Sequence, residues 1–402
     1  MHYNIKSGVY IVRGAVKSSI YDCNNDKHFW VDNAVIDDFV KLINREFVDE
    51  ETISDAMSLD LIESSSESSP QVMPDISELF DFARHIDYAW IELTNQCNLK
   101  CSHCYNETEQ RLKMQLSYDD FVHIANELVR YGVKSVQLIG GEPFLMKKDL
   151  LFRIFDYASK VFKEFEIFFN GTLCSRTDLE RIKNNYPNCS IAMSLHSFIR
   201  EEHEKITCVK GSYDKSVATL RNLQELNMKY RYVGIYVAGL NIGKEMNFGV
   251  PYRRDYIRLT GRGNLKHYDR GLLHEKLITL DTFKFNNLRD TLKSTYSEHC
   301  FANYVYVGSD MNVYPCVMER RFCHGNIRNH SLSEIIDRSI INMGKEQVEE
   351  CCECEFRHLC KDCRPDSMGR DKTAKPWYCT YDVKSGVWTN PDLFIDSILT
   401  GK

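Results

Sequence analysis

The sequence predicts an α/β fold with a parallel sheet, open or closed into a barrel, in the middle of the chain. Strand-like and helix-like segments alternate between residues 86 and 285, which is the pattern of repeated strand–helix units. Short strand-like runs precede this alternation, and after it long periodic segments give way to nine of the sixteen cysteines. We therefore predict three regions, at residues 1–85, 86–285 and 286–402.

The composition argues against several classes of protein. The chain has 402 residues and a formal net charge of −6, so a general affinity for nucleic acid is not expected. An apolar run of about 18 residues is missing, which predicts no membrane span. The N-terminus lacks the basic-then-apolar order of a signal peptide. Cysteines bunched at short spacings in a large chain without an export signal favour metal or cluster ligation in a reducing cytoplasm.

The first region is predicted to be a small winged-helix-like module. Three runs of strand character come first, at 9–12, 18–21 and 28–31. A helical apolar face follows from Val35. Three strands followed by two or three helices is the order of such a module, and a plain N-terminal cap is the alternative.

The middle region carries the strand–helix alternation. Strands are predicted at 89–93, 133–139, 166–169, 190–195 and 232–237. Helices are predicted between them, at 149–161, 176–185 and 213–226. Ser117 with Asp120 resembles a capping pair at the start of a further helix. In barrels built from such units, the chemistry lies at the C-terminal ends of the strands.

A three-cysteine loop, Cys97-x3-Cys101-x2-Cys104, lies just after the first of these strands. Three thiolates can hold three irons of a 4Fe–4S cluster and leave the fourth iron open for another ligand. Zinc held by the thiolates and His103 is the alternative. His103 directly precedes Cys104, however, and adjacent residues in a tight loop rarely converge on one small ion, which favours the cluster.

The motifs that follow this loop resemble those of the radical S-adenosylmethionine (SAM) superfamily. After successive strands come Gly140-Gly141-Glu142-Pro143, Asn170-Gly171-Thr172 and Ser194-Leu195-His196. Further segments at 203–207, 210–213 and 258–263 also look like family segments. The resemblance covers about 86–285 in order, and it implies a partial (β/α)6 TIM-like barrel of about six strands.

This resemblance implies where the cofactors bind. Cys97, Cys101 and Cys104 would hold the catalytic 4Fe–4S cluster, and its open iron would chelate SAM. One electron from the reduced cluster would cleave SAM to a 5′-deoxyadenosyl radical, which abstracts hydrogen from an unactivated C–H bond. The residues expected beside SAM are Gly140, Gly141, Glu142, Pro143, His103 near the adenine, Asn170, Ser194, and the strand segment that contains Tyr236.

The C-terminal cysteines resemble a SPASM domain, which follows the barrel in many peptide-modifying enzymes of this superfamily. Their order is Cys300-x15-Cys316, then Cys351-x2-Cys354-x5-Cys360-x2-Cys363, then Cys379. The pattern implies two auxiliary clusters, which we expect to be 4Fe–4S. One would be held by Cys351, Cys354, Cys360 and Cys379, and part of the other by Cys300, Cys316 and Cys363. Zinc is again the alternative.

This region departs from the SPASM pattern in three ways. Met311 stands where the family usually has glycine, two residues separate Cys360 from Cys363 where the pattern has three, and no fourth ligand closely precedes Cys300. Cys323 is a candidate fourth ligand, and Cys352 could replace Cys351. The isolated thiols are expected to be structural; they are Cys23, Cys174, Cys189 and Cys208.

Residues 12–22 resemble the start of grasp-with-SPASM maturases, which act on ribosomally made peptides encoded beside an ATP-grasp ligase. The first region would then be a precursor-recognition element that binds a leader peptide as an added strand. Residues 46–87 hold twelve acidic residues and one basic residue, so they could attract a basic leader or simply form a solvated face. Within them, the serine-rich segment 64–70 is typical of a mobile linker.

The leading hypothesis is therefore a radical SAM enzyme that cross-links a precursor peptide through a thioether, ether or C–C bond. A flavodoxin or ferredoxin would supply electrons, and an ATP-grasp ligase could act on the same peptide. An anaerobic sulfatase-maturating enzyme, which oxidises Cys or Ser to formylglycine, is the second hypothesis. A non-catalytic Fe–S or zinc module that binds peptides is the third.

Overall fold

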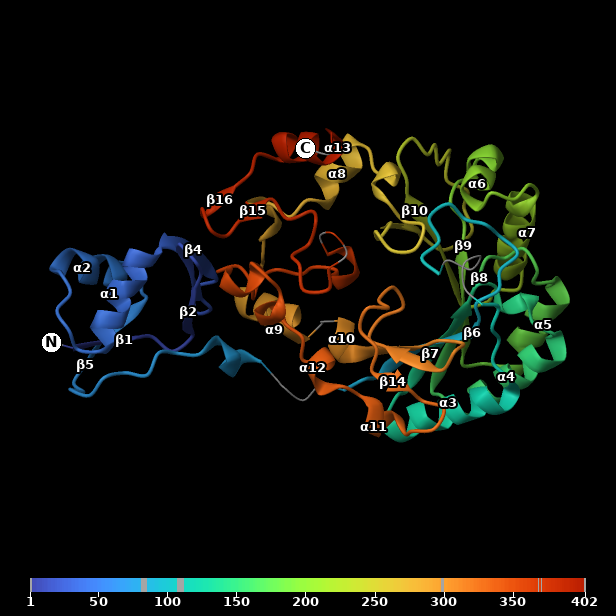
Figure 1. Ribbon diagram of the computed structural model, residues 1–402, viewed down its shortest axis with the longest axis horizontal. Coiled ribbons are helices and arrows are strands. Elements are labelled where there is room, and N and C mark those ends of the chain that lie inside the picture. The colour runs from blue at the N-terminus through green and yellow to red at the C-terminus, as the bar shows by residue number, and fades with distance from the viewer. Residues whose placement is uncertain are drawn as a thin grey trace.

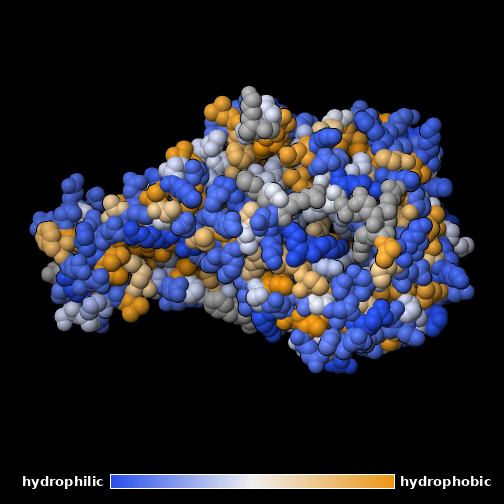
Figure 2. Space-filling model, viewed as in Figure 1, coloured by the Kyte–Doolittle hydropathy of each residue, from blue (hydrophilic) through white to orange (hydrophobic). Residues whose placement is uncertain are grey.

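The computed structural model describes residues 2–80, 85–106, 112–297, 300–367, 369 and 371–400. The molecule is elongated, as Figure 1 shows. The N-terminal module lies at one end, the sheet with its helices at the other, and most of the cysteine-rich region between them. The face drawn in Figure 2 is largely hydrophilic, with smaller apolar areas scattered over it.

The N-terminal module contains the three predicted strands and two that were not predicted. Strands β2 (Val9–Arg13), β3 (Lys17–Asp22) and β4 (Lys27–Asp32) form an antiparallel sheet. Strands β1 (His2–Ile5) and β5 (Ile62–Ser65) form a separate antiparallel pair. The helical elements are α1 (Asn33–Ile43), α2 (Glu50–Ser58) and the short 3-10 helix η1 (Ile76–Leu79). Ile20, Ile36 and Phe39 lie in the apolar core of the module.

The segment predicted to be a mobile linker, 64–70, begins inside a strand, and its residues 66–70 are exposed and lie outside helices and strands. Ser64 and Ser65 belong to β5 and pair with Tyr3 and His2 of β1. Just beyond the segment, Gln71 donates its side-chain amide to the Ile5 carbonyl at 2.9 Å. The serine-rich composition of 64–70 predicted a flexible segment, but its first two residues pair with strand β1.

A nine-stranded sheet forms the middle of the protein, in the order β11-β10-β9-β8-β7-β6-β12-β13-β14. Its six parallel barrel strands are β6 (Tyr88–Thr94), β7 (Ser135–Gly140), β8 (Glu164–Phe169), β9 (Cys189–Ser194), β10 (Tyr230–Tyr236) and β11 (Tyr252–Tyr256). Five of the six were predicted. Beyond β6, the sheet continues through β12 (Tyr304–Val307), β13 (Asn312–Tyr314) and β14 (Gly325–Asn326) of the cysteine-rich region.

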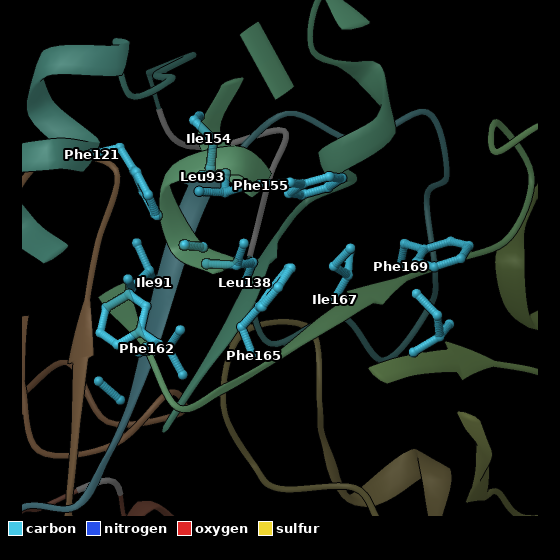
Figure 3. Packing of buried hydrophobic residues seen from close by; sticks show 14 of the residues in the cluster. Ile91, Leu93, Phe121, Leu138, Ile154, Phe155, Phe162, Phe165, Ile167 and Phe169 are labelled. Carbon is cyan, nitrogen blue, oxygen red and sulfur yellow. The ribbon is translucent and has the colours of Figure 1, made fainter. Parts of the chain in front are cut away.

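Helices cover one face of this sheet and bury its apolar side chains. They are α3 (Tyr118–Tyr131), α4 (Lys148–Val161), α5 (Arg176–Asn185), α6 (Arg200–Thr207) and α7 (Ser212–Glu225). Figure 3 shows Phe155 of α4 near Leu138 and Phe165 of the adjacent strands, all fully buried. The predicted Ser117–Asp120 capping box is present at the start of α3. This rigid layer fixes the strand ends that carry the site.

The cysteine-rich region contains short elements and loops. Helix α8 (Arg270–Lys276) precedes this region. Its own helices are α9 (Leu288–Ser297), α10 (Cys300–Asn303), α11 (Leu332–Ile335), α12 (Arg338–Ile341) and α13 (Pro391–Thr400), and β15 (Tyr381–Asp382) pairs with β16 (Val387–Trp388). Met311, at the position where the SPASM pattern has glycine, has φ of 65°, a left-handed conformation that glycine favours. None of the described helices has the length and apolar character needed to cross a bilayer.

The N-terminal module docks on the loop that carries Cys351, Cys354 and Cys360. Glu355 of this loop is fully buried, and its Oε1 accepts hydrogen bonds from Trp30 Nε1 of β4 at 2.6 Å and from the Tyr381 hydroxyl at 2.5 Å. The Glu355 carbonyl accepts from the Tyr21 hydroxyl at 2.7 Å. The module and the cysteine loop therefore share one buried network.

Candidate cofactor and cluster sites

The predicted cysteine loop and strand ends meet around one cavity of about 120 Å³. It lies at the carboxyl ends of β6 to β9, where parallel sheets place their chemistry. Predicted site residues in its lining are Cys97, Cys101, Cys104, His103, Gly140, Gly141, Asn170 and Ser194. Further polar residues of the lining near the loop are Tyr105, Asn106, His196, His203 and Thr207.

The end of α6 holds the cysteine loop. Lys100 and Ser102 donate their backbone amides to the carbonyls of Thr207 and Ile206, at 3.0 and 2.9 Å. On the other side of the loop, Arg262 donates its backbone amide to the Cys104 carbonyl at 2.9 Å. Sequence reasoning identified 203–207 and 258–263 as family segments but gave them no role. The structure shows that both brace the three-cysteine loop.

Gly140 and Gly141 pack against the backbone that leads into this loop. A Cβ on Gly140 would lie 2.2 Å from the Thr94 carbonyl oxygen, and one on Gly141 would lie 2.1 Å from that of Gln96. The Gly141 amide donates to Thr94 O at 2.7 Å. Close backbone approach therefore requires glycine at both positions, independently of any ligand.

Glu142 is fully buried behind the cavity wall. Its carboxylate accepts backbone hydrogen bonds from Phe144 at 2.9 Å and from Asn170 at 2.8 Å. Burial raises the pKa of Glu142 to about 7, against the effect of these two amides. Glu142 thus fixes the position of Asn170, and neither it nor Pro143 lines the cavity.

Tyr236 also lies outside the lining. Its ring stacks on Tyr256 at a centroid distance of 4.8 Å, and the Arg254 guanidinium lies 4.1 Å from its centroid. The expected contribution of this strand segment was through its backbone, and it stays a prediction.

Three neutral histidines form one wall of the cavity. The His103 ring meets His196 edge-on at 4.9 Å, and His196 stacks on His203 at 5.5 Å. Burial lowers the pKa of His103 to about 3 and that of His203 to about 4. The rings are therefore uncharged at neutral pH. His196 and His203 were absent from the predicted site, although both lie in the motifs that carried the family resemblance.

The C-terminal cysteines fall around two further cavities. Cys351, Cys354, Cys360 and Cys379 line one, together with Phe356 and Trp388. The other has about 280 Å³ and is lined by Cys300, Cys316, Cys360 and Cys363. These groupings are the two sets that the SPASM resemblance implied, except that Cys360 lies between both.

The remaining candidate ligands lie elsewhere. Cys323 and Cys352 are exposed and line neither cavity. Within the described ranges, no three His, Cys, Asp or Glu side chains are grouped closely enough to hold a single metal ion. Each cysteine set instead encloses a cavity, and thiolates are the usual ligands of iron–sulfur clusters, so the residues present fit such groups.

The fold and this site define a class: an α/β enzyme with a thiol-rich loop and a glycine-rich turn at the carboxyl ends of a parallel sheet. Residues 91–248 match the family model described as Radical SAM superfamily. Residues 91–248 are therefore a radical SAM domain.

Named relatives include a bacteriocin biosynthesis protein and a maturation protein. The antilisterial bacteriocin subtilosin biosynthesis protein AlbA of Bacillus subtilis (strain 168) is 25% identical over 73% of this chain and 70% of AlbA. The sporulation killing factor maturation protein SkfB of the same strain is 30% identical over 34% of this chain and 33% of SkfB. The solved structure of Streptococcus suis SuiB bound to precursor peptide SuiA has a TM-score of 0.54 at 13% identity, and the match covers 90% of this chain and 96% of SuiB. That likeness shows a shared fold.

Proposed function

We propose that this protein is a radical SAM maturase that modifies a ribosomally made precursor peptide by an intramolecular cross-link. The observation that carries the proposal is the arrangement of ten cysteines around three separate cavities, one at the strand ends and two in the C-terminal region. The likeness to AlbA, named for biosynthesis of the bacteriocin subtilosin, and to SkfB, named for maturation of the sporulation killing factor, supports a peptide substrate.

The cavity at the strand ends would hold SAM and the catalytic cluster. Cys97, Cys101 and Cys104 would ligate the cluster, and Gly140 and Gly141 would offer backbone to SAM. When bound, these cofactors supply a carbon radical that can abstract hydrogen from an unactivated C–H bond.

Asn170 is held ready to contact a ligand in this cavity. Its side-chain oxygen accepts from the Thr172 amide at 2.9 Å, and its side-chain nitrogen donates to Asn98 Oδ1 at 3.0 Å. Its backbone amide is fixed by Glu142. Because two side-chain contacts and one backbone contact fix this residue before a ligand arrives, little conformational entropy is lost on binding.

The neutral histidine wall suits an uncharged aromatic ligand. A charged imidazolium would repel the cationic sulfonium of SAM, whereas the buried rings of His103 and His196 stay neutral. Neutral rings also offer stacking faces for adenine. These side chains would orient SAM and keep water out of the reacting space.

The N-terminal module would bind the leader part of the precursor peptide. Its three-stranded sheet ends in strands β2 and β4, and an edge strand can pair with an added peptide strand. A flavodoxin or ferredoxin would serve as electron donor, and an ATP-grasp ligase could act on the same peptide. The electron donor belongs to the proposal through the radical SAM chemistry, and the ligase through the resemblance of residues 12–22 to grasp-with-SPASM maturases.

The test is co-expression with each short peptide encoded beside the gene, followed by mass spectrometry. We expect one peptide to lose the mass of a pair of hydrogen atoms and to show a fragmentation gap that spans the cross-linked residues. The triple variant Cys97→Ala/Cys101→Ala/Cys104→Ala should leave that peptide unchanged. Cys208→Ala, an exposed isolated thiol, is the matched control and should behave as wild type. Unmodified peptides throughout, or a formylglycine in a co-expressed sulfatase, would contradict the proposal.

A further inference from the structure

A buried group of three charges lies between the two C-terminal cysteine cavities. Its members are Lys345, Asp362 and Arg364, whose side chains are 10%, 2% and 3% exposed. Lys345 lines both cavities, as Cys360 does, whereas Asp362 and Arg364 line the larger one. No role was assigned to these residues from the sequence.

The group carries one net positive charge. Asp362 forms ion pairs with both cations: Arg364 Nε donates to its Oδ2 at 2.6 Å, and Lys345 Nζ pairs with its Oδ1. The two cations hold the pKa of Asp362 well below its usual range, despite its burial. A carboxylate shared between two cations leaves a surplus of one positive charge on side chains that are at most 10% exposed.

The other charged side chains that line the two cavities do not neutralise this positive charge. Lys375 and Glu350 line the smaller cavity and pair with each other at 2.6 Å, which makes them neutral together. The remaining charged side chains in the larger lining are Glu346, Arg357 and Lys361; Arg357 also lines the smaller cavity, but it is only half-buried. Of these charges, the Lys345 ammonium is the one that is both deeply buried and in contact with both cavities.

We propose that Lys345 sets the reduction potentials of both auxiliary clusters, as a shared buried cation between them. The inference rests on the proposed function, because it requires clusters in both cavities. Each reduction adds one electron to a cluster that its thiolate ligands already make negative. A nearby buried cation stabilises the reduced state more than the oxidised state, so it raises the potential. Both clusters would thereby become better acceptors of the electron released when a product radical is oxidised.

The experiment is an anaerobic redox titration with dithionite, monitored by electron paramagnetic resonance. It uses full-length protein in which Cys97, Cys101 and Cys104 are alanine, so that signals come from the auxiliary clusters alone. Lys345→Met keeps the length of the side chain and removes the charge. Lys375→Met is the matched control, since Lys375 lines only the cavity of Cys351, Cys354 and Cys379.

We expect Lys345→Met to lower both potentials, each by at least a tenfold change in the reduced-to-oxidised ratio, which is 59 mV for one electron. Lys375→Met should shift one cluster only. Lys345→Arg should restore both values. Asp362→Asn increases the buried positive charge and should shift both potentials upward, which gives a test of opposite sign if Lys345→Met loads poorly.

Two results would overturn the inference. One is a pair of unchanged potentials in Lys345→Met with full iron content. The other is a failure of Asp362→Asn to raise either potential. Failure of the underlying proposal looks different: the background protein would hold well under about eight irons, the content of two 4Fe–4S clusters.

Discussion

Glu355 is predicted to be the residue that fastens the N-terminal module to the loop of Cys351, Cys354 and Cys360. We compare two substitutions, Glu355→Ala and Glu355→Gln. Oε1 of the wild-type residue accepts from Trp30 at 2.6 Å and from Tyr381 at 2.5 Å. Alanine removes the acceptor for both donors, whereas glutamine can keep its amide oxygen in the same place.

The expected loss of unfolding free energy follows from the two hydrogen-bond donors that Glu355→Ala leaves without an acceptor. The Tyr381 hydroxyl is buried, the Trp30 indole is half-buried, and each donor that loses its partner costs about 1–3 kcal/mol. We therefore expect Glu355→Ala to lower the free energy of unfolding by about 2–6 kcal/mol. Glu355→Gln should stay within about 1 kcal/mol of wild type, because both hydrogen bonds persist without the negative charge.

The assay is urea denaturation of the reconstituted protein, with iron content measured on the same samples. Because the network reaches the loop of three cysteines, Glu355→Ala should also lose iron from the cluster of that loop, while Glu355→Gln should keep it. Equal stability and iron content in the alanine and glutamine variants would refute the reasoning. It would mean that the module and the loop are held by contacts other than this carboxylate.

Three further substitutions have defined outcomes. Gly141→Ala puts a Cβ 2.1 Å from the Gln96 carbonyl oxygen. Both the SAM affinity, measured by calorimetry, and the iron content of the catalytic site should therefore fall, and wild-type SAM binding would contradict the close packing. Burial lowers the pKa of His28 to about 4, so the folded state favours the neutral ring. The free energy of unfolding should therefore fall by up to about 3 kcal/mol as the pH falls from about 6.5 toward 4. His28→Gln should therefore show a shallower loss of unfolding free energy between about pH 7 and about pH 5, and an unchanged slope would exclude this histidine as the cause. Phe155→Ala in the sheet–helix core should cost about 3–5 kcal/mol by urea denaturation, and a loss under about 1 kcal/mol would show that the core collapses around the gap.

Local sequence patterns were sufficient for most of the fold. Alternating apolar segments gave five of the six parallel barrel strands, because strands buried on the helix-covered face have strong periodicity. The missed strand, β11 (Tyr252–Tyr256), reads Tyr-Arg-Arg-Asp-Tyr and has no apolar core of its own. Its position depends on stacking of Tyr252 on Tyr232 and of Tyr256 on Tyr236, contacts between strands that a local pattern does not reveal.

Candidate cluster ligands could be predicted where one sequence motif contains several of them. The loop of Cys97, Cys101 and Cys104 carries its own spacing, so its residues could be named from sequence alone. Lys345 and Glu355 could not, because their significance arises from partners far along the chain or in another region. Glu355 is adjacent to a recognised cysteine, yet Trp30, its partner, lies 325 residues away. Pairings of this kind require the tertiary structure.

The central claim is that three sets of cysteines hold three clusters, one of them catalytic. The most direct measurement is the iron and sulfide content of anaerobically reconstituted wild type and of Cys97→Ala/Cys101→Ala/Cys104→Ala, with 5′-deoxyadenosine assayed after addition of dithionite and SAM. The account predicts about 12 irons, a fall of about 4 in the triple variant, and loss of 5′-deoxyadenosine. About 8 irons in wild type would contradict the assignment of one C-terminal set. Zinc in place of iron, without 5′-deoxyadenosine, would contradict the account as a whole.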